Sequence, residues 1–325
     1  NTKNISAIRA FRIVSTHPKQ ILSFSIFERS DIMSELTIRN IQWFPGHMTK
    51  TRRMIAANLS LVDAVVEILD ARIPMSSRNP DMNSMVNNKP RLFILNKADM
   101  ADPKMTDKWI AYFKKQGIAA IAMDCKSGKG VKNFKGAIEQ LLSELLERRK
   151  NAGMIGTPIR LMIVGIPNVG KSSFINRMAQ SKRAKVEDRP GVTRTKQWVK
   201  IGSNMELLDM PGVLWPKFDD QEVAKRLAFT GAINDDVVDI EMLAMLLLEY
   251  LAKNYPDTLE TRYKMTEFNE MGGIELLETM GRKRGMLISG GEVNIERAAI
   301  TLIDEYRSGR LGRMTLESPE DIDNG

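Results

Sequence analysis

The residues with the clearest chemical meaning form a glycine-rich loop at residues 165–172, with the sequence GIPNVGKS. Its spacing fits the phosphate-loop pattern G-x-x-x-x-G-K-[ST], directly after an apolar run and before a helical pattern. Glycines let the backbone wrap a phosphate chain, so N–H groups of the loop and of the next helix point at the phosphate oxygens. We expect Lys171 to reach the β- and γ-phosphates and the Ser172 hydroxyl to bind Mg²⁺. Further predicted nucleotide contacts in this loop are Asn168, Val169, Gly170 and Ser173.

The base of the nucleotide is indicated by residues 96–99, NKAD, which end another apolar run. The carboxylate of Asp99 can accept hydrogen bonds from both N1–H and N2–H₂ of guanine, a donor pair that adenine lacks. Combined with the phosphate loop, this motif predicts a GTP site that includes Asn96, Lys97, Ala98 and Asp99. A later loop with Asp124 and Cys125 can give backbone N–H groups to the base oxygen, and an ordinary turn is the alternative.

Two more segments fit the switch elements of a GTPase. Residues 209–212, DMPG, would place Asp209 near Mg²⁺ and the N–H of Gly212 near the γ-phosphate. Thr193 lies between the two phosphate motifs, where it can close over Mg²⁺ only while the γ-phosphate is present. The guanine motif precedes the phosphate loop, although the usual GTPase order is the reverse. We therefore predict a circularly permuted GTPase.

These motifs require a sheet that brings their loops to one edge. Short apolar runs predict the strands of a parallel sheet covered by helices, at residues 62–69, 91–95, 119–123, 161–165 and 205–208. Residues 132–150 predict one helix, followed by a linker at 151–158. After residue 215 the strand pattern stops, and helical spacing predicts a small α-helical domain with helices at residues 222–229, 239–253, 274–284 and 293–307. The predicted fold is thus an α/β P-loop GTPase with a C-terminal α-helical domain.

The predicted boundaries are a leader at 1–40, the permuted GTPase domain at 41–216, a helical RNA-binding domain at 217–313 and an acidic tail at 314–325 that frays. The leader has no acidic residue before residue 28, as in a transit peptide. Residues 33–36, MSEL, read as a translation start, so an upstream extension is the interpretation we favour. Neither interpretation gives the leader a catalytic role.

Charge divides the chain into two parts. The net charge is +17 over residues 1–216 and −9 over residues 217–325. A positive excess of this size favours a polyanionic partner such as RNA, and simple solubility is the alternative. No apolar run is long enough to span a membrane, and the single cysteine excludes an intrachain disulfide.

Longer motifs carry a resemblance to a known family. They are IQWFPGHM at 41–48, DARIP at 70–74, RNP at 78–80, the permuted guanine and phosphate motifs, and LWP at 214–216. From about residue 41 to 317 the chain resembles the YlqF-like permuted GTPases of bacterial ribosome biogenesis. The resemblance implies a monomeric cytoplasmic GTPase that completes the large (50S) ribosomal subunit at a late step, binds its precursor and rRNA in the GTP state, and leaves on hydrolysis. Mitochondrial relatives share most motifs, so a mitochondrial counterpart is the alternative.

Hydrolysis requires a group that orients water. Val213 stands where small GTPases have a Gln, and an apolar side chain cannot polarise water. The resemblance implies that His47 substitutes, and a structural or RNA-contacting histidine is the alternative. It also implies K⁺ beside the phosphates at Asn168, with a structural Asn as the alternative.

Two other functions stay open on the sequence: a nucleotide-gated RNA-binding factor that barely hydrolyses GTP, and an ATP-using P-loop kinase. RNA phosphates can meet basic residues in the helical domain, although a solvated face explains them nearly as well: Arg282, Lys283, Arg284, Arg307, Arg310 and Arg313. A second basic cluster, Lys50, Arg52 and Arg53, follows His47.

Overall fold

The computed structural model describes residues 46–86, 89–154, 156–179, 197–202, 204–268 and 270–323. A six-stranded sheet has the order β3-β2-β1-β4-β6-β5. Its strands are β1 (Ala64–Asp70), β2 (Arg91–Asn96), β3 (Ala119–Ala122), β4 (Ile159–Val164), β5 (Gln197–Ile201) and β6 (Met205–Asp209). All neighbours pair in parallel except β5, which is antiparallel to β6. The five predicted strands are confirmed, and β1 is buried along its whole length, as expected for a central parallel strand.

Strand β5 is the one that the sequence did not predict. It forms the edge of the sheet, and polar residues such as Gln197 and Lys200 interrupt its apolar residues. Trp198 is 39% exposed. An edge strand with a solvated face lacks the continuous apolar run by which the other strands were found.

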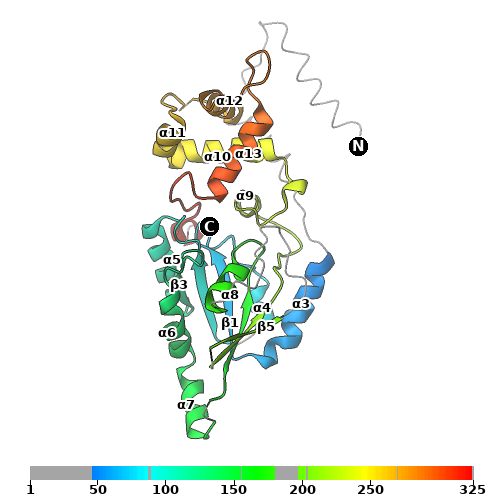
Figure 1. The fold of residues 1–325 in the computed structure, drawn as a ribbon, viewed down its shortest axis with the longest axis vertical. Coiled ribbons are helices and arrows are strands. Elements are labelled where there is room, and N and C mark those ends of the chain that lie inside the picture. The colour runs from blue at the N-terminus through cyan, green and yellow to red at the C-terminus, as the bar shows by residue number, and fades with distance from the viewer. Residues whose placement is uncertain are drawn as a thin grey trace. The chain divides into compact units, whose positions relative to one another are not determined.

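Helices cover the sheet (Figure 1). They are α3 (Gly46–Asn58), α4 (Met82–Val86), α5 (Pro103–Lys115), α6 (Val131–Leu141), α7 (Ser143–Asn151) and α8 (Lys171–Ala179), with a 3₁₀ turn at Leu59–Leu61. The single helix predicted at 132–150 is two helices, α6 and α7, with Leu142 between them. Helix α5 has a clear start signal, because the Asp102 side chain accepts hydrogen bonds from Lys104 N and Met105 N and Pro103 is the first helical residue.

A second group of helices gathers at one end of the sheet (Figure 1). It contains α9 (Gln221–Phe229), α10 (Ile240–Asn254), α11 (Pro256–Tyr263), α12 (Gly273–Lys283) and α13 (Ile295–Arg307), with a 3₁₀ turn at Asp235–Val237. The four predicted helices of this domain are confirmed, and α11 is additional. Helix α12 lies close to α10, since a Cβ built at Gly273 would stand 2.7 Å from the Cβ of Met245. No helix in the described ranges is long and apolar enough to cross a membrane.

The chain after α13 packs against the loops that follow β1 and β2. Met314, Thr315, Leu316 and Glu317 are buried, and Pro319–Asp323 forms helix α14. The expectation that this acidic tail frays is therefore wrong for residues 314–323. Composition could not reveal that the Glu317 carboxylate accepts hydrogen bonds from Ser76 N and Ser76 Oγ (3.0 and 2.5 Å). Paired in this way, a carboxylate can be buried.

The buried carboxylate of Glu305 in α13 connects this helix to α11 and to the end of α12. It accepts hydrogen bonds from Arg262 Nε (3.0 Å), Tyr263 Oη (2.8 Å) and Arg284 (3.1 Å). Burial opposes ionisation of Glu305, but the hydrogen bonds from Arg262 and Tyr263 outweigh burial and lower its pKa. A pKa that is lower in the folded state stabilises the fold at neutral pH, and this contribution is lost as the pH falls through the folded pKa.

We predict that Glu305→Ala lowers the free energy of unfolding by about 2 kcal/mol, because it leaves the buried Tyr263 hydroxyl without its acceptor and removes the shared partner of the partly exposed Arg262 and Arg284. The matched control is Glu278→Ala, an exposed position on neighbouring α12 that should change stability by less than about 0.5 kcal/mol. Urea unfolding followed by circular dichroism at pH 7 and pH 4 measures both. The difference between the variants should shrink at the lower pH, and equal stability of the two at pH 7 would contradict the role of Glu305.

Candidate nucleotide-binding site

The predicted phosphate loop connects β4 to α8. Strand β4 ends at Val164 and helix α8 begins at Lys171, so N–H groups at the start of α8 face the loop. Gly170 has φ +97° in the left-handed region, and a Cβ there would collide with the Asn96 side chain. Asn168 also has a left-handed backbone, with φ +59°. The loop therefore has the compact shape that phosphate binding requires.

Lys171 and Asp209 lie close together at the base of this loop. The ammonium group of Lys171 donates to the carbonyls of Gly165 (3.1 Å) and Ile166 (2.8 Å). Burial lowers the pKa of Lys171 to about 8, although Asp209 opposes this shift. Burial likewise raises the pKa of Asp209 to about 6, with Lys171 opposing. Asp209 Oδ1 is buried without a hydrogen-bond partner among the described residues.

Gly212 brings the segment after β6 against the phosphate loop. A Cβ built at Gly212 would stand 3.0 Å from Pro167 N and 3.1 Å from Lys171 Nζ. The next residue, Val213, is fully buried and donates its N–H to Gly165 O (3.3 Å). A side chain at position 212 would crowd the lysine that the sequence assigns to the phosphates.

Asn96 joins three loops that are far apart in the sequence. Its Nδ2 donates to Val169 O in the phosphate loop (2.7 Å), and its Oδ1 accepts from Cys125 N (3.1 Å). The guanine motif, the phosphate loop and the loop after β3 are thus in direct contact despite the permuted order. Asp99 is half-buried in the guanine loop.

The side chain of Asp124 shapes its own loop, and the Cys125 side chain beside it is buried. Asp124 Oδ1 accepts from Lys126 N (2.8 Å) and Ser127 N (3.2 Å). Burial opposes ionisation of Asp124, but hydrogen bonds from the side chain and backbone of Ser127 and from the backbone of Lys126 outweigh burial and lower its pKa. Burial, together with Asp124, raises the pKa of the Cys125 thiol to about 12. The sequence left open the roles of the Asp124 and Cys125 side chains. The hydrogen bonds show that Asp124 stabilises the turn that follows β3.

Helix α3 begins at Gly46 and carries His47 in its first turn, exposed to solvent. The next residue, Met48, is buried, and its sulfur accepts a hydrogen bond from Leu214 N (3.4 Å). His47 is therefore adjacent in sequence to a residue that contacts the chain just after Gly212. Thr193, the other predicted switch residue, lies outside the described residues, as do residues 41–45.

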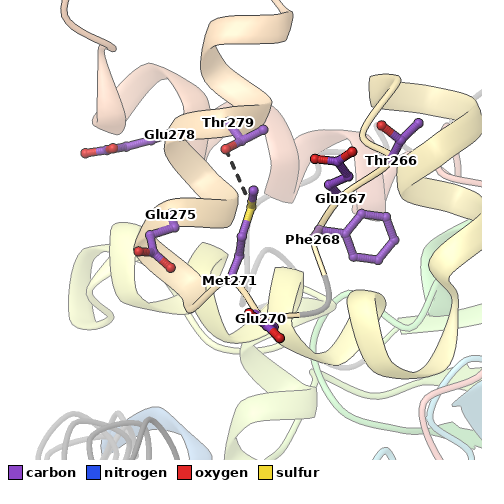
Figure 2. A pocket seen from close by; sticks show the side chains of 8 residues that line it. All are labelled: Thr266, Glu267, Phe268, Glu270, Met271, Glu275, Glu278 and Thr279. Carbon is purple, nitrogen blue, oxygen red and sulfur yellow. Dashed lines mark hydrogen bonds between the residues drawn. The ribbon is translucent and has the colours of Figure 1, made fainter. Parts of the chain in front are cut away.

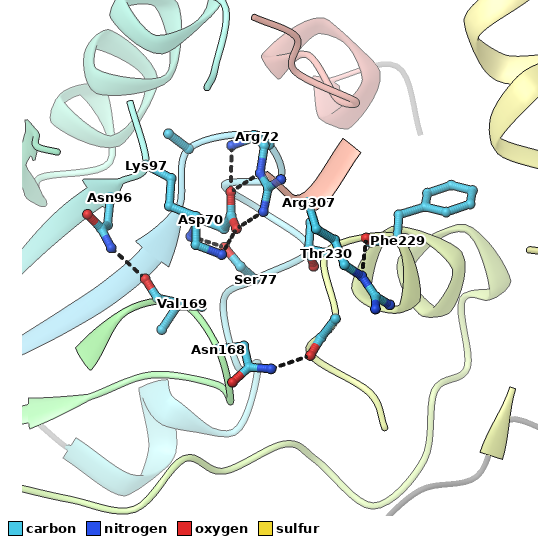
Figure 3. Close-up of polar contacts among 12 residues, drawn as sticks. Asp70, Arg72, Ser77, Asn96, Lys97, Asn168, Val169, Phe229, Thr230 and Arg307 are labelled. Carbon is cyan, nitrogen blue, oxygen red and sulfur yellow. Dashed lines mark hydrogen bonds and ion pairs between the residues drawn. The ribbon is translucent and has the colours of Figure 1, made fainter. Parts of the chain in front are cut away.

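A buried ion-pair network lies at the end of β1. Two of its residues, Asp70 and Arg72, belong to the DARIP motif at residues 70–74, to which the sequence assigned no separate role. Asp70 accepts from Arg72 at 2.9 and 2.8 Å and from Lys97 Nζ at 2.9 Å (Figure 3). Burial opposes ionisation of Asp70, but Arg72 and Lys97 outweigh burial and hold its pKa well below the usual range. Arg72 also donates to Tyr306 O in α13 (3.2 Å) and stacks over the Tyr306 ring. The network links the guanine loop to the helical domain.

Asn168 makes a second link to the helical domain. Its Nδ2 donates to Gly231 O (2.8 Å), in the turn that follows α9 (Figure 3). That turn is held by Arg307, which donates to Phe229 O (3.1 Å) and pairs with Asp235 (2.7 Å). The side chain predicted to serve K⁺ thus contacts the helical domain through its amide nitrogen.

Known proteins share this arrangement. Residues 160–266 match the family described as 50S ribosome-binding GTPase. Ribosome biogenesis GTPase A of Bacillus cereus is 47% identical over 282 residues, which cover 87% of this chain and 95% of that protein. The chain belongs to the ribosome biogenesis GTPase family. A relative of this family, mitochondrial ribosome-associated GTPase 1 of Xenopus tropicalis, is 35% identical over 85% of this chain and 94% of its own length.

Two solved structures of a similar protein have the same fold. The GDP-bound structure of TM YlqF has a TM-score of 0.62 and 30% identity, covering 83% of this chain and 100% of that chain. GNP-bound YlqF from T. maritima has a TM-score of 0.57 and 29% identity, with coverage of 83% and 99%. The predicted circularly permuted P-loop GTPase fold is confirmed. The protein binds guanine nucleotides and is a GTPase.

We predict that Asp99→Asn shifts nucleotide preference from guanine towards xanthine by at least about tenfold, or 1.4 kcal/mol. The substitution replaces an acceptor pair with one acceptor and one donor, which suits the additional carbonyl of xanthine. Competition of XDP against labelled GDP measures the shift. Asp107→Asn, on an exposed position of α5, is the matched control. If Asp99→Asn binds GDP as tightly as the parent does, the guanine assignment of Asp99 is wrong.

Proposed function

We propose that the protein is a GTP-dependent assembly factor for a late step of large ribosomal subunit maturation. It binds a subunit precursor and its rRNA in the GTP state and is released on hydrolysis. The names of the relatives support a ribosomal partner. The most similar relatives compared are bacterial, at 46–47% identity, which favours a cytoplasmic role over the mitochondrial alternative.

The observation that carries this proposal is the position of Gly212. It lies against Pro167 and Lys171, and the chain continues through buried Leu214 and Trp215 into helix α9. A γ-phosphate bound at Lys171 would therefore contact this segment. The presence of that phosphate can therefore set the position of the helical domain, as in other switch segments of GTPases.

The donor groups at the base of the loop fit Mg²⁺. Asp209 offers a buried carboxylate oxygen that has no partner among the described residues, and the Ser172 hydroxyl follows Lys171 at the start of α8. Such hard oxygen donors suit Mg²⁺, which neutralises phosphate charge when bound. We assign Ser172, Asp209 and Thr193 to this ion. Asn168 is our candidate for K⁺, through the side-chain oxygen that its bond to Gly231 leaves available.

We assign the orientation of the attacking water to His47. Val213 is buried and apolar, and His47 is exposed at the start of a helix whose next residue contacts Leu214. A neutral imidazole can orient water at pH 7. Among the described residues the His47 side chain makes no hydrogen bond or ion pair, so in our proposal docking on RNA completes its placement.

The helical domain offers two different surfaces to a partner. A cavity of about 720 Å³ is lined by Glu267, Glu270, Glu275 and Glu278 together with Phe268 and Met271 (Figure 2). Its acidic rim repels phosphate, so RNA is expected elsewhere. Arg282 and Lys283 are exposed at the end of α12, whereas Arg284 pairs with Glu305 and Arg307 with Asp235. The pair Arg282 and Lys283 is our candidate RNA contact.

Sedimentation of the protein with large-subunit precursors tests the proposal directly. Binding should be strong with a nonhydrolysable GTP analogue and weak with GDP. Equal binding with both nucleotides would contradict a GTP-state factor. Multiple-turnover assays with and without subunits separate a GTPase from a factor that barely hydrolyses GTP.

We predict that His47→Ala leaves GTP affinity nearly intact and reduces subunit-stimulated hydrolysis by on the order of 10² to 10⁴, the range for loss of a group that orients or deprotonates water. Single-turnover hydrolysis with saturating subunits avoids confusing chemistry with product release. The exposed neighbour Thr49→Ala is the control and should keep the parental rate. A parental rate for His47→Ala would give that histidine a structural role instead.

We predict that removing Arg282 and Lys283 together reduces the salt dependence of rRNA binding, since the slope of log K against log salt is about −0.9 for each phosphate neutralised. The double variant Lys114→Ala with Lys115→Ala loses the same charge from the exposed end of α5 and is the matched control. Filter binding across a salt series gives both slopes. Identical slopes for the two variants would remove this end of α12 as an RNA contact.

A further inference from the structure

Residues 309–317, which follow α13, lie along the guanine loop; we call them the C-terminal strap. Arg313 Nε donates to Asp99 O (3.0 Å), and Met314 N donates to Met100 O (3.0 Å). Thr315 Oγ1 accepts from Asp102 N (3.2 Å). Three consecutive strap residues thus hold the backbone of the guanine loop from Asp99 to Asp102.

The close fit continues at the start of the strap. Gly309 has φ +76°, and a Cβ built there would stand 2.9 Å from Met100 Cγ. Met100 N in turn donates to Lys97 O (2.9 Å), which closes the turn that carries Asp99. The strap therefore packs directly on the turn whose shape sets the direction of Asp99.

The other side of the strap is fixed to the helical domain and to the loop after β1. Tyr255 Oη donates to Thr315 O (2.7 Å) and accepts from Thr315 N (3.0 Å). Leu316 N donates to Arg72 O (2.8 Å). Glu317 is 3% exposed and pairs with Arg226 of α9 (3.3 Å). The position of the guanine loop consequently depends on where the helical domain sits.

Guanine selection requires a narrow geometry. The Asp99 carboxylate must meet N1–H and N2–H₂ together, and displacement by about 1 Å weakens such a pair strongly. Residues 97–102 lie between β2 and α5, outside the sheet ladder, and Lys97 has a left-handed φ of +60°. A non-glycine residue in this region persists only when its surroundings hold it. Asp70 holds the Lys97 side chain, and the strap holds the rest of this loop at residues 99–102.

We propose that the C-terminal strap positions the guanine loop, and that Arg313 and Thr315 are positioning residues for base selection by Asp99. The proposal rests on the guanine role of Asp99 proposed above. It gives Arg313 a use other than RNA binding. It also connects the partner of the helical domain to the nucleotide base, since a partner that moves Tyr255 or Arg226 moves the strap.

The test compares the affinities for GDP and IDP in the full chain carrying Arg313→Ala with Thr315→Val. Inosine lacks the exocyclic amino group, so the ratio of the two dissociation constants reports how well Asp99 meets that group. We expect the preference for GDP to fall by at least about threefold, as for the weakening of one hydrogen bond. General loosening of the protein would weaken both nucleotides alike and leave the ratio unchanged.

Two further variants sharpen the comparison. Arg310→Ala removes an exposed arginine from the same connection and should keep the parental ratio. Arg313→Lys with Thr315→Ser retains a donor and a hydroxyl and should recover most of the preference. Thermal unfolding checks that each variant is folded, and Arg313→Ala alone, an exposed substitution, serves if the double variant is not.

Asp99→Asn is measured in parallel to separate this proposal from the one on which it rests. If Asp99→Asn abolishes the preference for GDP over IDP and the strap variant retains the parental ratio, the strap proposal is overturned and the guanine site stands. If Asp99→Asn itself retains the parental ratio, the guanine assignment fails and the strap proposal fails with it.

Discussion

Two opposite charges, Asp70 and Arg72, are buried together at the end of β1, where each is 1% exposed. Removing such a pair from water is costly, and the cost is offset only when the remaining donors and acceptors also find partners. The Asp70 carboxylate also pairs with Lys97 Nζ, and a further N–H of Arg72 donates to Tyr306 O. The need to satisfy the buried charges of Asp70 and Arg72 therefore fixes the guanine loop and helix α13 relative to β1.

The acceptor that Arg72 finds is itself a consequence of helix geometry. Tyr306 lies in the last turn of α13, where backbone carbonyls have no partner within the helix and partial negative charge accumulates. The Tyr306 carbonyl accepts from Gly309 N (3.1 Å) and also from the buried guanidinium of Arg72 (3.2 Å), which benefits from the local charge. The Arg72 guanidinium also lies over the Tyr306 ring, and this cation–π contact adds a further attraction between Arg72 and α13. One side chain thereby anchors the helical domain to the strand that borders the phosphate-loop strand.

The sequence predicted what depends on local spacing. The phosphate loop, the guanine motif and the parallel strands are each encoded within about ten residues, and their order alone indicated the permutation. Contacts between distant segments were not accessible in that way. Asn168 meets Gly231, and the apparently free arginines Arg284 and Arg307 are paired inside the fold. A count of charges treats each cation as available, whereas folding uses several of them to satisfy buried carbonyls and carboxylates.

The helical domain contacts the nucleotide-binding loops at two places, one at each end of the predicted nucleotide position. The two contacts have different consequences for nucleotide affinity. Asn168 contacts it beside the predicted phosphate position, and Asp99 contacts it through the C-terminal strap beside the predicted base position. GTP and GDP share the base and differ only in the γ-phosphate. A displacement of the helical domain that acts through the strap must therefore change the affinity for both nucleotides. In the proposed site, discrimination between them is expected where the γ-phosphate would bind, beside Gly212 and the predicted switch residue Thr193.

Linkage makes these effects reciprocal. If a partner that binds the helical domain raises GTP affinity relative to GDP affinity, then GTP must raise affinity for that partner by the same factor. The γ-phosphate provides such a difference only if it contacts a group that moves, and Gly212, against Lys171, belongs to the segment that continues into α9. The strap instead allows the same partner to loosen whichever nucleotide is bound. The assembly factor that we propose must both respond to GTP and release GDP, and the two contacts, one at each end of the predicted nucleotide position, would serve these two steps.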